Sequence, residues 1–357
     1  MGEVLLVSPG REVVLGRAGP ADGGAVLVRQ TAATALPTGP LASAGVSRRA
    51  LAVSSDGDRL TVHNRGRAAL RIDGRPTDGG PVEPGSTVEL DGQLVLLAAR
   101  RPDAIAIQSV LPAVRFGGAD AHGIVGESPA VWELRARLVQ VARRSGHVLI
   151  TGPSGTGKEL VARALHAGSD RRSGPWVARN AATFPEGLID AELFGNVRNY
   201  PNPGMRERPG LIGDADRGVL FLDEVGELPQ ALQAHLLRVL DRGEYQRLGE
   251  GATHRVDLRV VAATNRDVAE LKDDFAARFP IRVAVPGLDP RRDDIPLLVN
   301  HLLREMRAED PTLDRWFDGD HPRLDPALVV DLVTRPYQTH VRERHRLLWD
   351  AVDQSPG

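Results

Sequence analysis

The glycine-rich segment GPSGTGKE at positions 152–159 constrains this chain more than any other feature. It follows HVLIT, an apolar run typical of a buried strand, and precedes ELVARALHA, which has a helical pattern. Glycines in such a turn let backbone N–H groups converge on phosphate oxygens, and the N-terminus of the following helix favours negative charge. Lys158 would then reach the β- and γ-phosphates of a nucleotide. The alternative is a glycine-rich turn beside an ordinary surface lysine.

Lysine is rare in this chain. Of 45 basic residues only Lys158 and Lys272 are lysine, so the composition strongly favours arginine. Because one of these two lysines, Lys158, lies in the glycine-rich segment, we expect it to have a functional role.

Polar residues end two further apolar strands. VLFLDEV places Asp223 and Glu224 directly after a buried strand, where Asp223 would hold Mg²⁺ and Glu224 would polarise an attacking water. LRVVAATNRD ends with Thr264 and Asn265, which are suited to sense a γ-phosphate or hold the water. Without the other motifs, the acids would be a simple exposed strand end, and Asn265 would cap the next helix.

The distribution of strand and helix patterns divides the chain into four segments. Residues 1–100 contain short β segments separated by Gly, Pro and Asp, which predicts an all-β sandwich. Residues 101–122 resemble a linker. Residues 123–286 alternate strands with helices, which predicts an α/β domain with a parallel sheet built from HVLIT, WVARN, VLFLD, LRVVAAT and IRVAV. A helix is expected from Pro229 to Gly243, and residues 287–357 are expected to form an all-α subdomain.

Composition excludes several classes of protein. The net charge of −2 argues against a chain held mainly by non-specific attraction to nucleic acid, and the absence of cysteine excludes disulfides, thiolate metal sites and cysteine nucleophiles. No apolar run is long enough to span a membrane and no signal peptide is recognisable, so we expect a cytoplasmic protein. The ten histidines show no metal-ligand pattern, and His340 and His345 are expected to face solvent.

The three strand-end motifs together resemble the AAA+ ATPases, specifically the central domain of bacterial enhancer-binding proteins that activate sigma-54 RNA polymerase. The similarity runs from about Gly123 to Val352, and that family also carries Glu at the position of Glu159. It implies ATP and Mg²⁺ as cofactors, an α-helical lid and a homo-oligomeric ring, by analogy a hexamer. The implied nucleotide-binding residues are Gly152, Gly155, Thr156, Gly157, Lys158, Glu159 and Asp223.

The same resemblance implies four further catalytic roles. WVARNAATFPEGLIDAELFG contains the family's switch asparagine, here Asn180, which would restrain Glu224 until hydrolysis. LKDDFAARF resembles the segment that completes a neighbouring subunit's site: Arg278 matches its second arginine, while Lys272 replaces the first and keeps the charge without the planar fork. HVRERHRLL places Arg342 near the γ-phosphate. The alternative for Arg278 is a surface ion pair with Asp273 or Asp274.

The largest departure from the family lies in the loop that contacts the sigma factor. Where the family carries GAFTGA, this chain has NYPNPG at 199–204, and two prolines stiffen the loop. The ATPase is therefore expected to be present while the contact with sigma-54 is altered or replaced. Tyr200 is the candidate new contact residue, or else a packed loop aromatic.

The N-terminal β segment resembles a forkhead-associated (FHA) domain, a sandwich that binds phosphothreonine. Gly16-Arg17 and the Ser47-Arg48 segment match its signature, and Arg17, Ser47 and Arg48 would bind the phosphate. Ala50 and Ala68, however, stand where the family has His and Asn. The alternative is a degenerate sandwich used for assembly or intramolecular docking.

These observations favour an ATPase that remodels a protein partner to control transcription under phospho-signalling. Residues 287–357 leave no room for a helix-turn-helix, so no specific DNA binding is expected from this chain. One rival is an AAA+ remodeller of a complex without sigma-54. The other is a scaffold that binds nucleotide and phosphopeptide with little hydrolysis.

Overall fold

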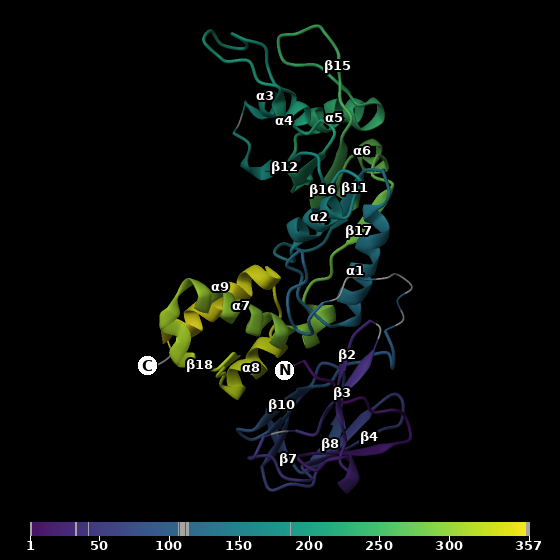
Figure 1. Cartoon of the computed structure of the whole chain (residues 1–357), viewed down its shortest axis with the longest axis vertical. Helices are drawn as coiled ribbons and strands as arrows, with labels where there is room; N and C mark the ends of the chain where they lie inside the picture. Colours follow the sequence, from purple (N-terminus) through teal and green to yellow (C-terminus); the bar gives the residue numbers. More distant parts are fainter. Residues whose placement is uncertain are drawn as a thin grey trace.

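The computed structural model describes residues 2–32, 34–41, 43–105, 107, 111, 114–185 and 187–354. Figure 1 shows the N-terminal β region (purple) at one end, the α/β region (teal to green) at the other, and the C-terminal helices (yellow) beside their junction. Part of the expected linker 101–122, and residues 355–357 of the expected helical subdomain, lie outside the described residues. No helix in the described part is long and apolar enough to cross a membrane.

The N-terminal region is a sandwich of two antiparallel sheets, as expected for an all-β domain. Apolar residues of both sheets, such as Leu15, Leu51 and Leu90, point toward each other and form one shared core. The apolar segment VLLVS at the start of this region forms an isolated bridge between Val4 and Val28. The sheets have the orders β1 (Glu12–Leu15), β4 (Leu51–Ser55), β5 (Leu60–Asn64), β8 (Gly79–Val82), and β10 (Leu94–Leu97), β9 (Thr87–Leu90), β6 (Leu70–Ile72), β7 (Arg75–Thr77), with a hairpin of β2 (Leu27–Gln30) and β3 (Ala35–Gly39).

All five strands expected in the α/β region form one parallel sheet. Alternate residues point to opposite faces, so Leu149, Leu220 and Ala262 join one apolar cluster while Ile150 and Phe221 join the other. The order is β12 (Trp176–Asn180), β13 (Val219–Asp223), β16 (Arg259–Thr264), β11 (Val148–Thr151), β17 (Ile281–Ala284).

Helices cover both faces of this sheet. One face packs on α1 (Pro129–Ala142) and α2 (Lys158–Ala167). The other packs on α5 (Gln230–Arg242), which forms where expected and buries the apolar face containing Leu232, Leu236 and Val239. The shorter elements are α3 (Ile189–Phe194), α4 (Gly210–Asp214), α6 (Asp273–Ala277) and the pair β14 (Glu244–Tyr245) with β15 (His254–Arg255).

A buried arginine and a buried histidine fix the start of β16. The guanidinium of Arg259 donates to backbone carbonyls at the end of α1 and just beyond it, including Val141 O at 2.9 Å and Gly146 O at 3.0 Å. Burial lowers the pKa of Arg259 to about 10. His147 Nδ1 accepts the N–H of Val260 at 3.0 Å, so this nitrogen carries no proton.

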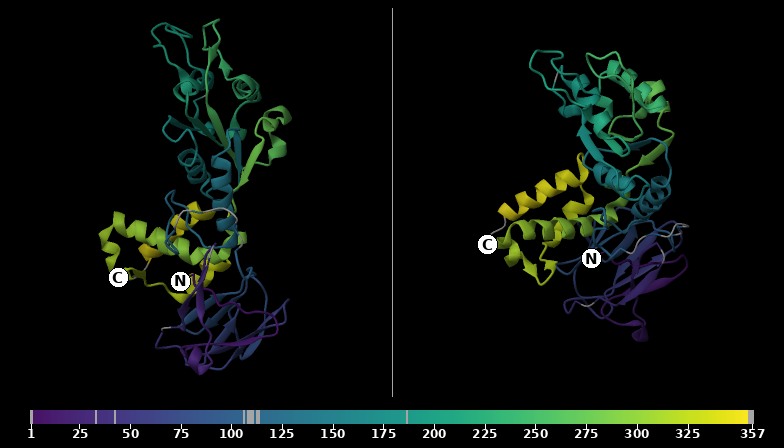
Figure 2. Two further views of the ribbon diagram at one scale, coloured as in Figure 1. Left: turned by 45° about the vertical axis from the view of Figure 1, so that its right-hand side comes forward. Right: turned by 45° about the horizontal axis from the view of Figure 1, so that its top comes forward.

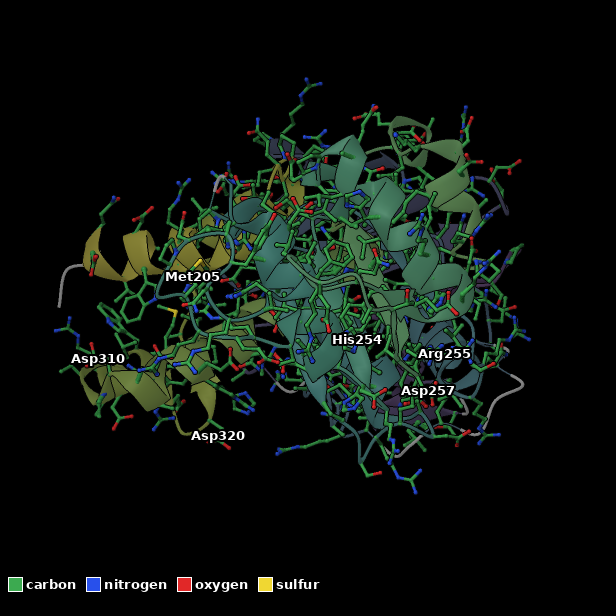
Figure 3. All side chains as sticks on the ribbon, turned by 90° about the horizontal axis from the view of Figure 1, so that it is seen from above. Met205, His254, Arg255, Asp257, Asp310 and Asp320 are labelled. Carbon is green, nitrogen blue, oxygen red and sulfur yellow. The ribbon has the colours of Figure 1, made fainter. Side chains whose placement is uncertain are left out.

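The C-terminal region packs α7 (Ile295–Glu309), α8 (Pro326–Thr334) and α9 (His340–Gln354) around one apolar cluster. It also contains a two-stranded hairpin of β18 (Phe317–Asp318) and β19 (His321–Pro322), which the expectation of an all-α region lacked. In Figure 3, Asp310 and Asp320 lie at the side of the molecule away from His254, Arg255 and Asp257.

The expectation that His340 faces solvent is wrong. Its side chain is buried, because α9 packs against the segment that leads into the C-terminal helical region. There Nδ1 of His340 accepts the backbone N–H of Leu288 at 3.2 Å.

Candidate nucleotide-binding site

The glycine-rich segment forms a tight loop between β11 and α2. Gly152, Gly155 and Gly157 have φ values of 156°, 74° and 91°, a backbone region that favours glycine. A Cβ at Gly152 would lie 2.6 Å from the carbonyl oxygen of Val285, so the close approach also requires glycine. The hydroxyl of Thr156 donates to Pro153 O at 2.9 Å and holds the loop closed.

Lys158 begins α2 and lies at the centre of this loop. Its side chain is only 5% exposed, and its ammonium donates to Gly152 O at 3.1 Å and Pro153 O at 3.2 Å. The same ammonium lies 3.7 Å from the carboxylate of Glu224. The glycine-rich loop and the end of β13 therefore share one cation.

The carboxyl ends of four strands share the edge of the sheet at which Lys158 lies. Parallel pairing places Thr151 of β11 opposite Thr264 of β16, and Asn180 of β12 opposite Asp223 of β13. Parallel strands bring their carboxyl ends to one edge of the sheet, which is where open α/β sheets bind ligands. The three polar strand ends identified in the sequence are therefore neighbours in space.

Glu224 is held in an uncommon backbone conformation. Its φ of 49° and ψ of 46° are left-handed, and its N–H bonds Asp223 Oδ1 at 3.0 Å. Its Oε2 accepts the N–H of Asn265 at 3.3 Å, while the hydroxyl of the fully buried Thr264 accepts the N–H of Arg266 at 3.0 Å. Asn265 does not cap the following helical turn, since Asp267 does so.

A cleft of about 620 Å³ connects these residues to the C-terminal region. Gly155, Thr156, Gly157, Lys158, Glu159, Asp223 and Glu224 line its polar end. Its remaining walls include the apolar residues Ile124, Val125, Val285, Leu298 and Leu302. A polar end rich in backbone N–H groups and an apolar remainder match the phosphates and the base of a nucleotide.

The N-terminus of α9 contacts the glycine-rich loop. Val341 N–H donates to Gly155 O at 3.2 Å, and a Cβ at Gly155 would lie 2.1 Å from Thr339 O. Arg342 is exposed and lines the cleft. The helical C-terminal region therefore covers the loop, as a lid does.

Several other expected site residues point elsewhere or are not among the residues that line the cleft, and the latter include Gly152, Thr264 and Asn265. Asn180 Oδ1 accepts Ala182 N–H at 2.8 Å. Half-buried Lys272 precedes α6. Glu159 lines the cleft but pairs with Arg163 on the outer face of α2 at 2.8 Å.

Arg278 forms an ion pair with Asp241 of α5, whereas the sequence had suggested Asp273 or Asp274. The difference arises because α6 packs against α5, a contact that sequence proximity does not indicate.

The cleft also contains residues that the motifs did not identify. Arg291, His301, Glu305 and His345 line it from the lid, and His301 Nε2 lies 3.3 Å from Glu305 Oε1. The spacing of 298, 301, 302 and 305 places one face of α7 toward the cleft, a helical periodicity that could have identified His301 and Glu305.

The residues expected to bind phosphothreonine lie on adjacent loops. Arg17 N–H donates to Ser47 O at 3.1 Å, and a Cβ at Gly16 would lie 2.3 Å from Arg48 O, so the pairing of these loops requires glycine there. Arg48 pairs with Asp22 at 2.7 Å, and Arg17 is exposed.

The loop containing NYPNPG protrudes from the end of the molecule farthest from the β region, beside the loop at 246–253 (Figure 2). Asn196 is fully buried at its base and donates to Val197 O and Arg206 O, both at 2.9 Å. Tyr200 is 43% exposed and its ring packs against Gly249. Tyr200 is therefore partly a packed aromatic and partly available for contact.

Comparison with known proteins shows which proteins this site resembles. Residues 124–285 match the sigma-54 interaction domain. The chain is 45% identical over 244 residues to the Nif-specific regulatory protein of Bradyrhizobium diazoefficiens, covering 66% of this chain and 40% of that protein. It is 37% identical over 241 residues to the regulatory protein AtoC of Escherichia coli, covering 66% of this chain and 51% of that one. The chain thus spans about half the length of these curated relatives.

A solved structure shows the same relationship. NtrX of Brucella abortus in complex with ATP aligns with a TM-score of 0.55 at 33% identity, covering 62% of this chain and 50% of that one. Together with the parallel sheet, the glycine-rich loop and the acidic strand end, these matches show that residues 124–285 resemble the sigma-54 interaction domain in sequence and in fold.

Proposed function

We propose that this chain hydrolyses ATP in the cleft between the parallel sheet and the lid. The observation that carries the proposal is the meeting of Lys158 with Glu224 at the closed end of the glycine-rich loop, 3.7 Å apart. Phosphoryl transfer depends mainly on positioning and on neutralising charge. The loop N–H groups and Lys158 supply positive charge, and the carboxylate of Glu224 supplies a base that orients water.

Asp223 is the proposed holder of Mg²⁺. Among the described residues, no group of three or more His, Asp or Glu side chains could hold a metal ion without further ligands. A site of one carboxylate fits Mg²⁺, which proteins commonly bind through one or two carboxylates together with the substrate's phosphates. The ion would neutralise charge on the phosphates, and Asp223 at the end of β13 would fix its place.

The proposed active form is a homo-oligomeric ring, by analogy a hexamer. Arg278 and Lys272 lie near α6, outside the cleft of their own chain, which suits residues that act on a neighbouring subunit. Arg342 of the lid would contact the γ-phosphate, and Thr264 and Asn265 would sense it. Asn180 would restrain Glu224, with which it shares the edge of the sheet through the pairing with Asp223.

The proposed output is ATP-driven movement of the loop at 196–209 against a protein partner, with transcription regulation as the consequence. The matched sigma-54 interaction domain supports the sigma-54 RNA polymerase as that partner, and the regulatory proteins among the relatives support a regulatory output. The second candidate is a complex without sigma-54, which NYPNPG favours because it replaces GAFTGA. Pull-down of purified sigma-54 with a transition-state analogue bound decides between the two.

The N-terminal sandwich is the proposed input domain. The adjacent loops bearing Arg17, Ser47 and Arg48 support binding of a phosphothreonine protein, since phosphate recognition needs arginine and a hydroxyl together. A phosphothreonine peptide array tests this, and binding that is indifferent to Ser47→Ala would contradict it.

The test of the ATPase proposal is phosphate release by the purified chain at increasing protein concentration. We expect specific activity to rise with concentration as rings assemble, and Glu224→Gln to lower it about 100-fold or more, as removal of a general base does. Glu227→Gln is the matched control, because Glu227 pairs with Arg266 at the surface. Nucleotide binding without turnover by the native chain would favour the scaffold hypothesis instead.

A further inference from the structure

Arg101 joins the β-sandwich to both parts of the ATPase region. Its Nε donates to Gln30 Oε1 of β2 at 2.8 Å, and its Nη2 donates at 2.7 Å to the carbonyl of Glu127, just before α1. Its Nη1 forms an ion pair with Asp293, in the 3-10 turn Asp289–Asp294 that leads into α7. The side chains of Arg101 and Asp293 are only 8% and 21% exposed, so this contact is largely withdrawn from water.

The segments that Arg101 contacts, residues 126–128 and 293–294, lie at the junction between the α/β region and the lid, and we call this junction the hinge. Asp294, next to Asp293, accepts the N–H groups of Glu127 at 2.6 Å and Ser128 at 2.8 Å, and the hydroxyl of Ser128 at 2.6 Å. A Cβ at Gly126 would lie 2.6 Å from Asp294 Oδ2. The backbone before α1 is therefore pressed against the turn before α7.

The same two segments also contribute walls of the nucleotide cleft. Ile124 and Val125 line the cleft just before Glu127 in the chain, and Arg291 lines it just before Asp293. A shift of either segment at the Arg101 contact would therefore change the shape of the cleft.

We propose that Arg101 is a positioning residue for nucleotide binding. By bonding to Glu127 and Asp293, Arg101 sets the angle between the lid and the glycine-rich loop. Because Arg101 also bonds to the β-sandwich, that angle depends on the docking of the β-sandwich. This inference rests on the proposed ATP site. It adds that the input domain acts on the cleft through the hinge, rather than only through contacts between subunits.

The charge balance at the hinge supports a specific role for Arg101. Burial, together with the neighbouring Asp294, raises the pKa of Asp293, and Arg101 opposes that rise. Loss of Arg101 leaves a mostly buried carboxylate without its cation, which is costly in a poorly hydrated site. The turn before α7 would then move to hydrate Asp293.

The test compares Arg101→Gln with Arg100→Gln in the full chain. Arg100 is the matched control, because it is exposed and donates only a long 3.4 Å bond to Asp58 O. With a fluorescent ADP analogue as the probe, we expect Arg101→Gln to weaken binding about tenfold, which is a typical magnitude for coupling between two sites. Arg100→Gln should bind the analogue as tightly as the native chain does. In steady-state hydrolysis, KM should rise while kcat stays within about twofold.

A second measurement separates positioning from simple stability. Hydrogen exchange at the Val341 amide, which bonds Gly155 O, should quicken in Arg101→Gln even where the unfolding midpoint is unchanged. If Arg101→Gln fails to fold, Asp293→Asn decides, and it should weaken ADP binding similarly. Equal ADP affinity in the native chain and the folded hinge variants overturns this inference alone. A native chain that binds no adenine nucleotide overturns the proposed function as well.

Discussion

The ammonium of Lys158 lies 3.7 Å from the carboxylate of Glu224, although the two residues belong to different strand–loop units of the sheet. A nucleotide's phosphates would compete with Glu224 for this cation and release the carboxylate toward water. The pairing therefore links occupancy of the cleft to the state of the proposed base.

The two lysines of the chain provide a matched test of the cleft. Lys158→Ala should weaken binding of a fluorescent ATP analogue by about 10- to 100-fold, because a hydrogen bond to a charged group is worth about 1.5–3 kcal/mol. At protein concentrations too low for rings to assemble, Lys272→Ala should leave binding unchanged, since Lys272 lies outside the cleft of its own chain and is proposed to act only on a neighbouring subunit. Equal losses in both variants would contradict the assignment of Lys158.

Glycine at 155 is expected to matter for the lid as well as for the loop. Gly155 and Gly74 have φ values of 74° and 73°, so alanine at either position pays the left-handed penalty of about 1–2 kcal/mol. A Cβ at Gly155 also meets Thr339 O at 2.1 Å, whereas Gly74 has open space. Thermal unfolding should shift in both variants, but nucleotide affinity should fall only in Gly155→Ala.

Mixing two inactive variants tests whether Arg278 acts between subunits. Arg278→Ala should lower hydrolysis about 10³-fold or more if it acts as an arginine finger. Loss of its surface pair with Asp241 should cost no more than about 1 kcal/mol of stability. Because Glu224→Gln subunits still carry Arg278, mixed rings should recover activity that neither variant has alone. Absence of recovery in rings shown to be mixed would place Arg278 outside the active site.

Stability should depend on pH through His147. Burial, and next the cation of Arg259, hold the pKa of His147 below its ordinary value of 6.5, while a hydrogen bond to Leu240 O opposes this. As pH falls from 6.5 toward the lowered pKa, the unfolded chain binds the proton more readily, so the folded state loses stability.

The measurement is the unfolding midpoint between pH 7.5 and 5.5. His147→Gln should reduce the loss on acidification, whereas His321→Gln, at an exposed position in β19, should not. An unchanged slope in His147→Gln would show that this histidine does not titrate on unfolding.

The sheet and the centre of the site were predictable because their signals are local. The three central strands β13, β16 and β11 are apolar runs, and parallel strands bring their ends together, so Lys158 and Asp223 could be expected to meet. In the β-sandwich, β3, β7 and β8 were not expected, since ALPTG, RPT and GGPV contain residues that disfavour strands.

The remaining contacts depend on how distant elements pack. From the sequence, His340 is a polar residue in a helix that was expected to be exposed. Its burial results from the docking of α9 against Gly287 and Leu288. The Arg101 contact likewise joins residues from three regions of the chain. Contacts between residues of distant segments cannot be predicted from the sequence pattern within any single helix or strand.

The three bonds that Asp294 accepts from Glu127 and Ser128 restrict how the lid can travel. A body pinned at one point can rotate but cannot slide, so displacement grows with distance from the pin. A small turn at Asp294 would sweep the outer ends of α7 and α9 through the widest arc, so a small change at the nucleotide cleft would become a long displacement at the far end of the lid.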